Sequence, residues 1–337
     1  MRTLTLAWLL GLFSVPLWLH DLYALHTLIV TGIFIIAAMS LNLLLGYTGQ
    51  LSLGHVAFFG VGAYVSSLVA LGFEVHVLPA WRVSLTPKPV WLGMLCGIVA
   101  AGLCGFLIGR LSFKVRGAYF VIVTVSFAEV VRLVAVNWVE LTQGPMALTN
   151  IPALRVRIPA LLDISFARKP ASYYLVLSVG VLAYVLIRRL IGSRIGRALI
   201  ALRENEPLAA SIGVDATYYL VLATVLSASI AGAAGVLYAH YVRIVDPDIF
   251  LFIYTVTMVI MVISGGKGTL AGPVVGGLIF GLVPEVLRAL AINPEVQWIV
   301  YGVLMVLIVH FLPEGIVPAV RGRLAARRAA GDPEPRT

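Results

Sequence analysis

Charged residues and cysteines are both scarce in this sequence. Asp, Glu, Lys and Arg make up 12% of the 337 residues, whereas soluble domains contain about 25%. This scarcity excludes an ordinary soluble enzyme and a disordered chain. Two cysteines, Cys96 and Cys104, are too few for a disulfide scaffold. On one helix they would lie about 12 Å apart along the axis, beyond the reach of a disulfide.

Apolar residues are abundant instead, at 61% of the chain. One helix that spans a bilayer needs roughly 20 apolar residues, so the composition predicts an all-α, polytopic transmembrane bundle. The apolar runs predict about ten spans, near residues 4–19, 25–45, 54–73, 90–110, 117–138, 172–190, 216–239, 249–264, 271–292 and 295–312. The first run is short enough to be a signal peptide. However, Arg2 is its only leading cation and no small-residue cleavage site precedes His20, which favours a retained helix.

The positive charge of the chain predicts its orientation. A net charge of +9 would indicate nucleic acid in a soluble protein, but here the Lys and Arg residues fall mainly in alternate loops. With the N-terminus inside, the inner loops hold about twice as many as the outer loops, so we expect both termini in the cytoplasm and no nucleic-acid partner. We expect short surface helices in the outer loops at 74–89 and 139–171, a single membrane domain over 1–320, and a basic, disordered tail over 321–337.

Two glycine-rich segments interrupt the apolar runs. The first, 46–55, contains Gly49, Gln50, Ser52, Gly54 and His55; the second is 264–272. The predicted topology places both on the same side of the membrane. Irregular backbone at membrane depth occurs only inside protein or beside water, and broken helices form substrate sites in many transporters. A tight turn between packed helices, with small residues at the contact, explains the same pattern.

Two Glu-x-x-Arg pairs lie within the predicted spans. Glu129 and Arg132 are three residues apart, as are Glu285 and Arg288, and this spacing places both members on one helix face. Charges inside a membrane cost several kcal/mol unless they are paired. The pairs therefore indicate either a polar wall of a translocation path or structural ion pairs near the outer interface.

The cytoplasmic segment 192–215 is too long for a simple connector. It contains helix formers, a small-residue face at Ala201, Ala209 and Ala210, and Gly213 as a C-cap. This pattern predicts short amphipathic helices that either dock a partner or rest on the lipid surface.

The sequence offers no convincing catalytic or metal site. The segment around Lys267 does not match the phosphate-binding loop Gly-x4-Gly-Lys-Ser/Thr. Met261 stands where the first glycine is required, and Gly268 stands where Ser or Thr should follow the lysine. No two histidines have metal-ligand spacing. A nucleophile built from Ser52 and His55 rests on spacing alone. We therefore expect no catalytic residue, no metal and no cofactor in this chain.

Five stretches together resemble the signatures of branched-chain amino acid ABC importer permeases. They are Leu41–His55 with Phe58–Tyr64, Arg116–Phe120, Thr142–Pro145, Gly196–Val214 and Gly265–Pro273. The length and the outer loop resemble the longer, M-type permease subunit. The chain has Pro145-Met146-Ala147 where relatives often have Pro-Asn-Gly, which leaves the ligand open.

The resemblance implies a complex in the bacterial inner membrane. A paralogous second permease would complete the pore, two cytoplasmic ATPase subunits would bind ATP and magnesium, and a periplasmic binding protein would deliver the substrate. It assigns coupling to the ATPases to residues of the segment 192–215, namely Arg203, Glu204, Glu206, Ala210 and Gly213.

Three alternatives remain at this point. A permease for urea or short amides would look similar. An ion-coupled secondary transporter working alone would use Glu129 and Glu285 to couple transport to a proton or sodium gradient. A membrane enzyme ranks last, because the sequence has no convincing active site. The resemblance leaves open which substrate is transported, which residues line the pore, and whether the permease pair is a heterodimer or a homodimer.

Overall fold

The computed structural model describes residues 11, 13–14, 16, 18, 21–78, 81–112, 118–158 and 162–330. Most of the first predicted span, 4–19, lies outside these residues. The helices are α2 (Leu22–Leu45), α3 (Val56–Leu71), α4 (Val90–Ser112), α5 (Ala118–Asn137), α6 (Val139–Thr142), α7 (Lys169–Gly192), α8 (Arg194–Glu204), α9 (Glu206–Ser211), α10 (Ala216–Val242), α11 (Phe252–Gly265), α12 (Gly272–Ala289), α13 (Pro294–Phe311) and α14 (Ile316–Ala330). Two 3₁₀ turns are also present: η1 (Gly144–Met146) follows α6, and η2 (Pro247–Phe250) lies between α10 and α11.

Five of the described helices are long and apolar enough to cross a membrane: α2, α4, α5 from Tyr119, α7 and α10. Two further apolar helices, α3 and α11, are shorter. Helices α2 and α10 form the centre, with 67% of each apolar window buried, whereas α7 lies at the periphery with 17%. The chain is therefore a multi-pass helical membrane protein.

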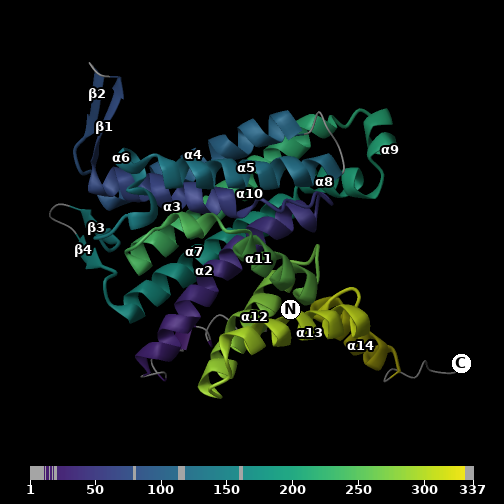
Figure 1. Cartoon of the computed structure of the whole chain (residues 1–337). Helices are drawn as coiled ribbons and strands as arrows, with labels where there is room; N and C mark the ends of the chain where they lie inside the picture. The colour runs from purple at the N-terminus through teal and green to yellow at the C-terminus, as the bar shows by residue number, and fades with distance from the viewer. Residues whose placement is uncertain are drawn as a thin grey trace, which may run out of the picture.

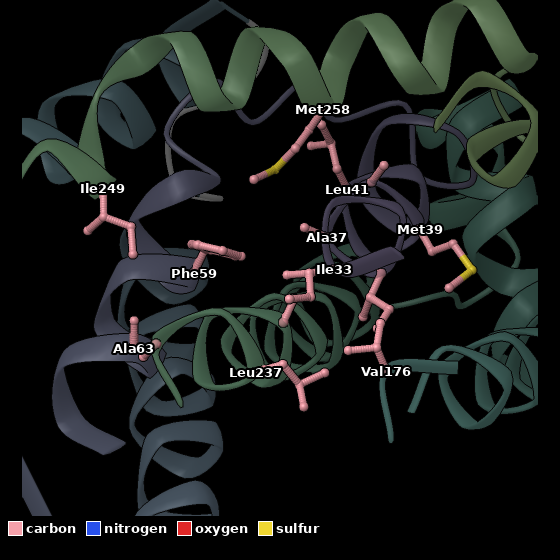
Figure 2. Packing of buried hydrophobic residues seen from close by; sticks show 14 of the residues in the cluster. Ile33, Ala37, Met39, Leu41, Phe59, Ala63, Val176, Leu237, Ile249 and Met258 are labelled. Atoms are coloured by element: carbon pink, nitrogen blue, oxygen red, sulfur yellow. The ribbon is translucent and has the colours of Figure 1, made fainter. Parts of the chain in front are cut away.

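Small residues let three helices approach closely around α10. A Cβ atom on Gly62 of α3 would overlap the backbone of Gly232 on α10, and one on Gly97 of α4 would lie 2.6 Å from the carbonyl oxygen of Gly62. Such contacts are typical of helix packing in membranes, where water does not drive association. Larger side chains from several helices form the main hydrophobic cluster around α2: Figure 2 shows among them Ile33, Phe59, Val176, Leu237, Ile249 and Met258.

The outer loops contain β-hairpins, which corrects the prediction of surface helices and of a purely α fold. Strand β1 (Phe73–Leu78) pairs antiparallel with β2 (Trp81–Leu85), and β3 (Arg155–Ile158) pairs with β4 (Leu162–Ser165). Alternating β-branched residues in these segments favour strands. Within the described part of these loops, α6 and η1, directly after α5, are short helical turns of the expected kind.

The two ends of the bundle differ. The hairpins lie at one end, at the left of Figure 1, and α8, α9 and α14 lie at the other. The tail expected over 321–337 begins inside α14, which continues to Ala330 because alanine and arginine favour helix. Residues 331–337 lie outside the described part of the chain. We refer below to the hairpin end and the α8–α9 end.

Candidate functional site

At the α8–α9 end the two glycine-rich breaks meet, and a single buried amide joins them. Asn42, in the last turn of α2, donates through Nδ2 to the carbonyl oxygen of Thr269 at 2.9 Å. Its Oδ1 accepts from the backbone N–H of Gly268, also at 2.9 Å. A Cβ atom on Gly46 would overlap this N–H, so glycine is required for the contact. The sequence analysis did not single out Asn42, although an amide in an apolar run signals a buried hydrogen-bonded group.

Arg203 of α8 attaches the surface helix to the same junction. Its Nη1 donates to the carbonyl oxygen of Gly46 at 2.6 Å, and its Nε donates to Glu204 Oε1 at 3.0 Å. A Cβ atom on Gly268 would lie 3.0 Å from Arg203 Nη1. We call Asn42, Gly46, Arg203 and Gly268 the break junction. It brings together a predicted coupling residue and both predicted breaks.

The left-handed backbone of Gly49 is part of the same contact. This glycine has φ +73°, a conformation that L side chains rarely adopt, and a Cβ on it would lie 3.1 Å from Arg203 Cγ. Gly49 is exposed and Gln50 is half-buried. Beside the junction, burial raises the pKa of the Tyr47 hydroxyl to about 12, so this group stays neutral.

Helices α8 and α9 form the predicted amphipathic pair. Ser193 caps α8 by accepting from the N–H of Ile195, and Asn205 caps α9 by accepting from that of Leu208. Leu199, Leu202 and Ala209 are buried. The opposite face is exposed and partly apolar, with Leu208 62% and Ile212 75% exposed. The remaining predicted coupling residues lie on or beside this face: Glu204, Ala210 and Gly213 are exposed and Glu206 is half-buried.

Three of the predicted path residues lie in the interior of this chain. Ser52, Gly54 and His55 are buried, and a Cβ on Gly54 would overlap the carbonyl oxygen of Thr124 on α5. His55 Nε2 lies 2.8 Å from Ser40 Oγ. Since that hydroxyl donates its only proton to the Ala37 carbonyl, the imidazole N–H is the donor.

The neighbouring hydrogen bonds show that His55 belongs to the packing of α2. The Ser40 carbonyl accepts from Ser227 Oγ on α10, so His55 and Ser40 link the first break to two central helices. His55 is therefore paired with Ser40 rather than with Ser52. This arrangement differs from the Ser52–His55 pairing considered for a nucleophile, and it fixes the break against α2 and α5.

The Glu129–Arg132 ion pair is present and faces outward from α5. Arg132 Nη2 lies 2.7 Å from Glu129 Oε1, and Arg132 Nε donates to both carboxylate oxygens at 3.0 and 3.1 Å. The Glu129 side chain is 52% exposed and that of Arg132 is 27% exposed. Helix α5 packs beside α3, α4 and η2, so this pair is separate from the break junction.

The second predicted pair is only partly described. Arg288 Nη1 donates to the Tyr23 hydroxyl at 2.8 Å, which connects α12 to the start of α2. The side chain of Glu285 lies outside the described residues. Among those residues, no group of three or more potential metal ligands occurs.

Apolar helices, two interlocked breaks and a surface helix bonded to them define a polytopic membrane permease. The chain belongs to the family described as branched-chain amino acid transport system, permease component, which matches residues 23–309. This membership fits a transport subunit and not an enzyme.

Curated relatives cover most of the chain. It is 31% identical to the high-affinity branched-chain amino acid transport system permease protein LivM of Salmonella typhimurium, over 88% of this chain and 70% of that protein. Identity to the Escherichia coli LivM is 30%, over 90% and 72%. The permease protein LivH of Salmonella typhimurium is 26% identical, over 84% and 91%. No solved structure matches the chain.

Proposed function

We propose that this chain is one half of the membrane pore of an ABC importer for branched-chain or related hydrophobic amino acids. The observation that carries the proposal is the hydrogen bond from Arg203 on the surface helix α8 to Gly46 in the first break. It supplies a direct mechanical link between a docking surface and the broken helices. Family membership and the similarity to LivM and LivH supply the class of substrate.

In this proposal α8 and α9 dock an ATPase subunit. The exposed apolar side chains of Leu208 and Ile212, flanked by Glu204 and Glu206, offer a partner both apolar area and charge. Ala210 and Gly213 leave room for close approach at the end of α9. Movement of α8 would carry the Arg203 guanidinium and with it the Gly46 carbonyl. A pore alternates between two states only when such contacts differ between them.

The ion pair on α5 points to a second membrane subunit. An exposed pair of charges at membrane depth is costly against lipid. We infer that this face of α5, with Glu129 and Arg132, lines the translocation path or the contact with a paralogous permease. Gly49 and Gln50 belong to the inner mouth of the path, whereas Ser52, Gly54 and His55 hold the break in position for gating.

The complete machine would contain this chain, a second permease, two ATPase subunits that bind ATP and magnesium, and a periplasmic binding protein. It would reside in the bacterial inner membrane, with the α8–α9 end and both termini in the cytoplasm. Positive charge on the predicted inner loops supports this orientation.

Reconstitution of the complex in proteoliposomes tests the function. We expect ATP-dependent leucine uptake that requires every subunit and that excess valine or isoleucine inhibits. Inhibition by urea and not by valine would assign the chain to a urea or short-amide importer. Uptake by the purified single chain under a proton or sodium gradient, without ATPase subunits, would instead establish a secondary transporter.

A further inference from the structure

A cavity of about 340 Å³ opens at the hairpin end, among the ends of α2, α7 and α10. It has the size of a small-molecule site. The polar residues of its wall are His26, Lys169, Ser172, His240, Tyr241 and Arg243. It lies at the opposite end of the bundle from the break junction, and nothing in the proposed transport cycle uses it.

The wall carries positive charge without a compensating carboxylate. Lys169 and Arg243 contribute two cations, and none of the lining residues is Asp or Glu. The nearby carboxylate of Asp21 caps α2 by accepting from the N–H of Tyr23 at 2.9 Å. Lys169 Nζ donates to the Leu22 carbonyl at 2.9 Å, which holds the ammonium in place while two of its protons remain for a ligand.

The start of α7 adds to the positive electrostatic potential of the cavity. The helix begins at Lys169, and its N-cap, Arg168, makes no side-chain capping bond. The N-terminal end of a helix attracts anions through its dipole and its free N–H groups, although Pro170 in this first turn has no N–H to contribute. Arg243, an exposed residue in the left-handed conformation with φ 66° at the end of α10, also lines the cavity.

The histidine and tyrosine side chains form a fixed wall. His240 Nδ1 donates to the Pro152 carbonyl at 2.8 Å, so its Nε2 accepts from Ser66 Oγ at 2.7 Å. His26 Nδ1 lies 2.7 Å from the Tyr241 hydroxyl, and the two rings stack at 5.5 Å. A preorganised wall loses little conformational entropy when a ligand binds.

The surroundings match the headgroup layer of a bilayer. Leu22, whose carbonyl binds Lys169, is 60% exposed, and Tyr23 beside it is 47% exposed. Tyr174, half-buried, follows in the first turns of α7, and half-buried Tyr241 lies in the last turn of α10. Tyrosines gather at the membrane–water interface because one edge of the ring is apolar and the hydroxyl needs water. Below them, α7 exposes Leu182 and Leu186 to the acyl chains.

We propose that this cavity binds the phosphate group of an anionic phospholipid, with Lys169 and Arg243 as its two cationic contacts. Basic pockets between membrane helices bind anionic headgroups on the cytoplasmic side of membranes, and the same chemistry applies to this pocket at the hairpin end. The proposal requires only that the chain spans a membrane, so it stands or falls independently of the transported substrate.

Native mass spectrometry of the complex in detergent with added phosphatidylglycerol tests the site. Two interfacial cations contribute about 1 kcal/mol each, so the K169Q/R243Q variant should retain this lipid roughly 30-fold less well. The matched control, K88Q/R188Q, removes one Lys and one Arg elsewhere and should retain it as the unmodified chain does. K169R should preserve binding, which separates loss of charge from misfolding, and size-exclusion profiles confirm assembly.

Two further probes identify the source of the phosphate. Glycerol 3-phosphate offers the headgroup chemistry without acyl chains, and diacylglycerol offers the chains without phosphate. We expect neither to displace phosphatidylglycerol at equal concentration. Full retention of phosphatidylglycerol by K169Q/R243Q, equal binding of diacylglycerol, or binding of glycerol 3-phosphate in place of the lipid would each overturn the proposal.

Discussion

The Arg203 guanidinium donates a hydrogen bond to the Gly46 carbonyl at 2.6 Å, across 157 positions of sequence. One partner lies on an exposed surface helix and the other in the turn that ends α2, one of the two central helices. Gly46 in turn touches Gly268 of the second break. A displacement of α8 therefore reaches both breaks through a single side chain.

Replacing Arg203 by Ala should separate ATP hydrolysis from transport. A hydrogen bond to a charged group contributes about 1.5–3 kcal/mol, so its loss should lower coupled leucine uptake by at least roughly tenfold while the ATPase subunits still turn over. Both rates are measured in proteoliposomes of the full complex. Arg188→Ala, which removes an exposed arginine of α7 outside the α8–α9 surface, should leave both rates unchanged. Tightly coupled uptake by Arg203→Ala would show that the contact transmits nothing.

Replacing Asn42 by Ala should lower the stability of the folded chain. Its side chain bonds both Thr269 and Gly268 in a buried position, and Asn42→Ala leaves a donor and an acceptor without partners. We expect a loss of about 2–3 kcal/mol in unfolding free energy, seen as a lower thermal midpoint in detergent. Asn137→Ala is the control, because this exposed amide bonds only within its own helix. Equal midpoints for the two variants would contradict the role of Asn42.

The sequence predicted the long apolar helices well, because a spanning segment shows itself in local composition alone. Helices α2, α4, α5, α7 and α10 coincide closely with apolar runs. The hairpins were missed because the prediction for these loops rested on their length, although each strand is only four to six residues long and carries a short alternation of β-branched and polar residues. The ion pair of Glu129 and Arg132 was predicted correctly because its three-residue spacing is local.

The break junction could not be predicted in the same way. Its contacts join residues more than 150 positions apart, and no periodic pattern encodes which loops meet. The sequence signalled that the breaks are unusual, and the resemblance drew attention to Arg203, but only the folded backbone shows that Arg203 reaches Gly46. Burial of Ser52, Gly54 and His55 likewise depends on the rotation of helices, which composition does not determine.

Gly54 should tolerate no side chain. A Cβ atom there would overlap the Thr124 carbonyl of α5, and overpacking of this kind typically costs about 1–3 kcal/mol. We expect Gly54→Val to insert into the membrane but to lose leucine uptake and to melt at a lower temperature. Gly192→Ala is the control, because nothing lies within 4 Å of its Cβ position. Normal uptake by Gly54→Val would show that α5 can move away from the break.

Variants of the Glu129–Arg132 pair should distinguish a structural role of the pair from a role in the translocation path. Removing one member leaves an unpaired charge, which is unfavourable at membrane depth, so Glu129→Gln and Arg132→Gln should each reduce the assembled complex recovered from membranes. The double variant Glu129→Gln/Arg132→Gln removes both charges and should restore assembly. Leucine uptake by the reassembled double variant is then the deciding measurement. We expect it to remain low, because a path wall needs the polar groups themselves; full recovery would make the pair purely structural.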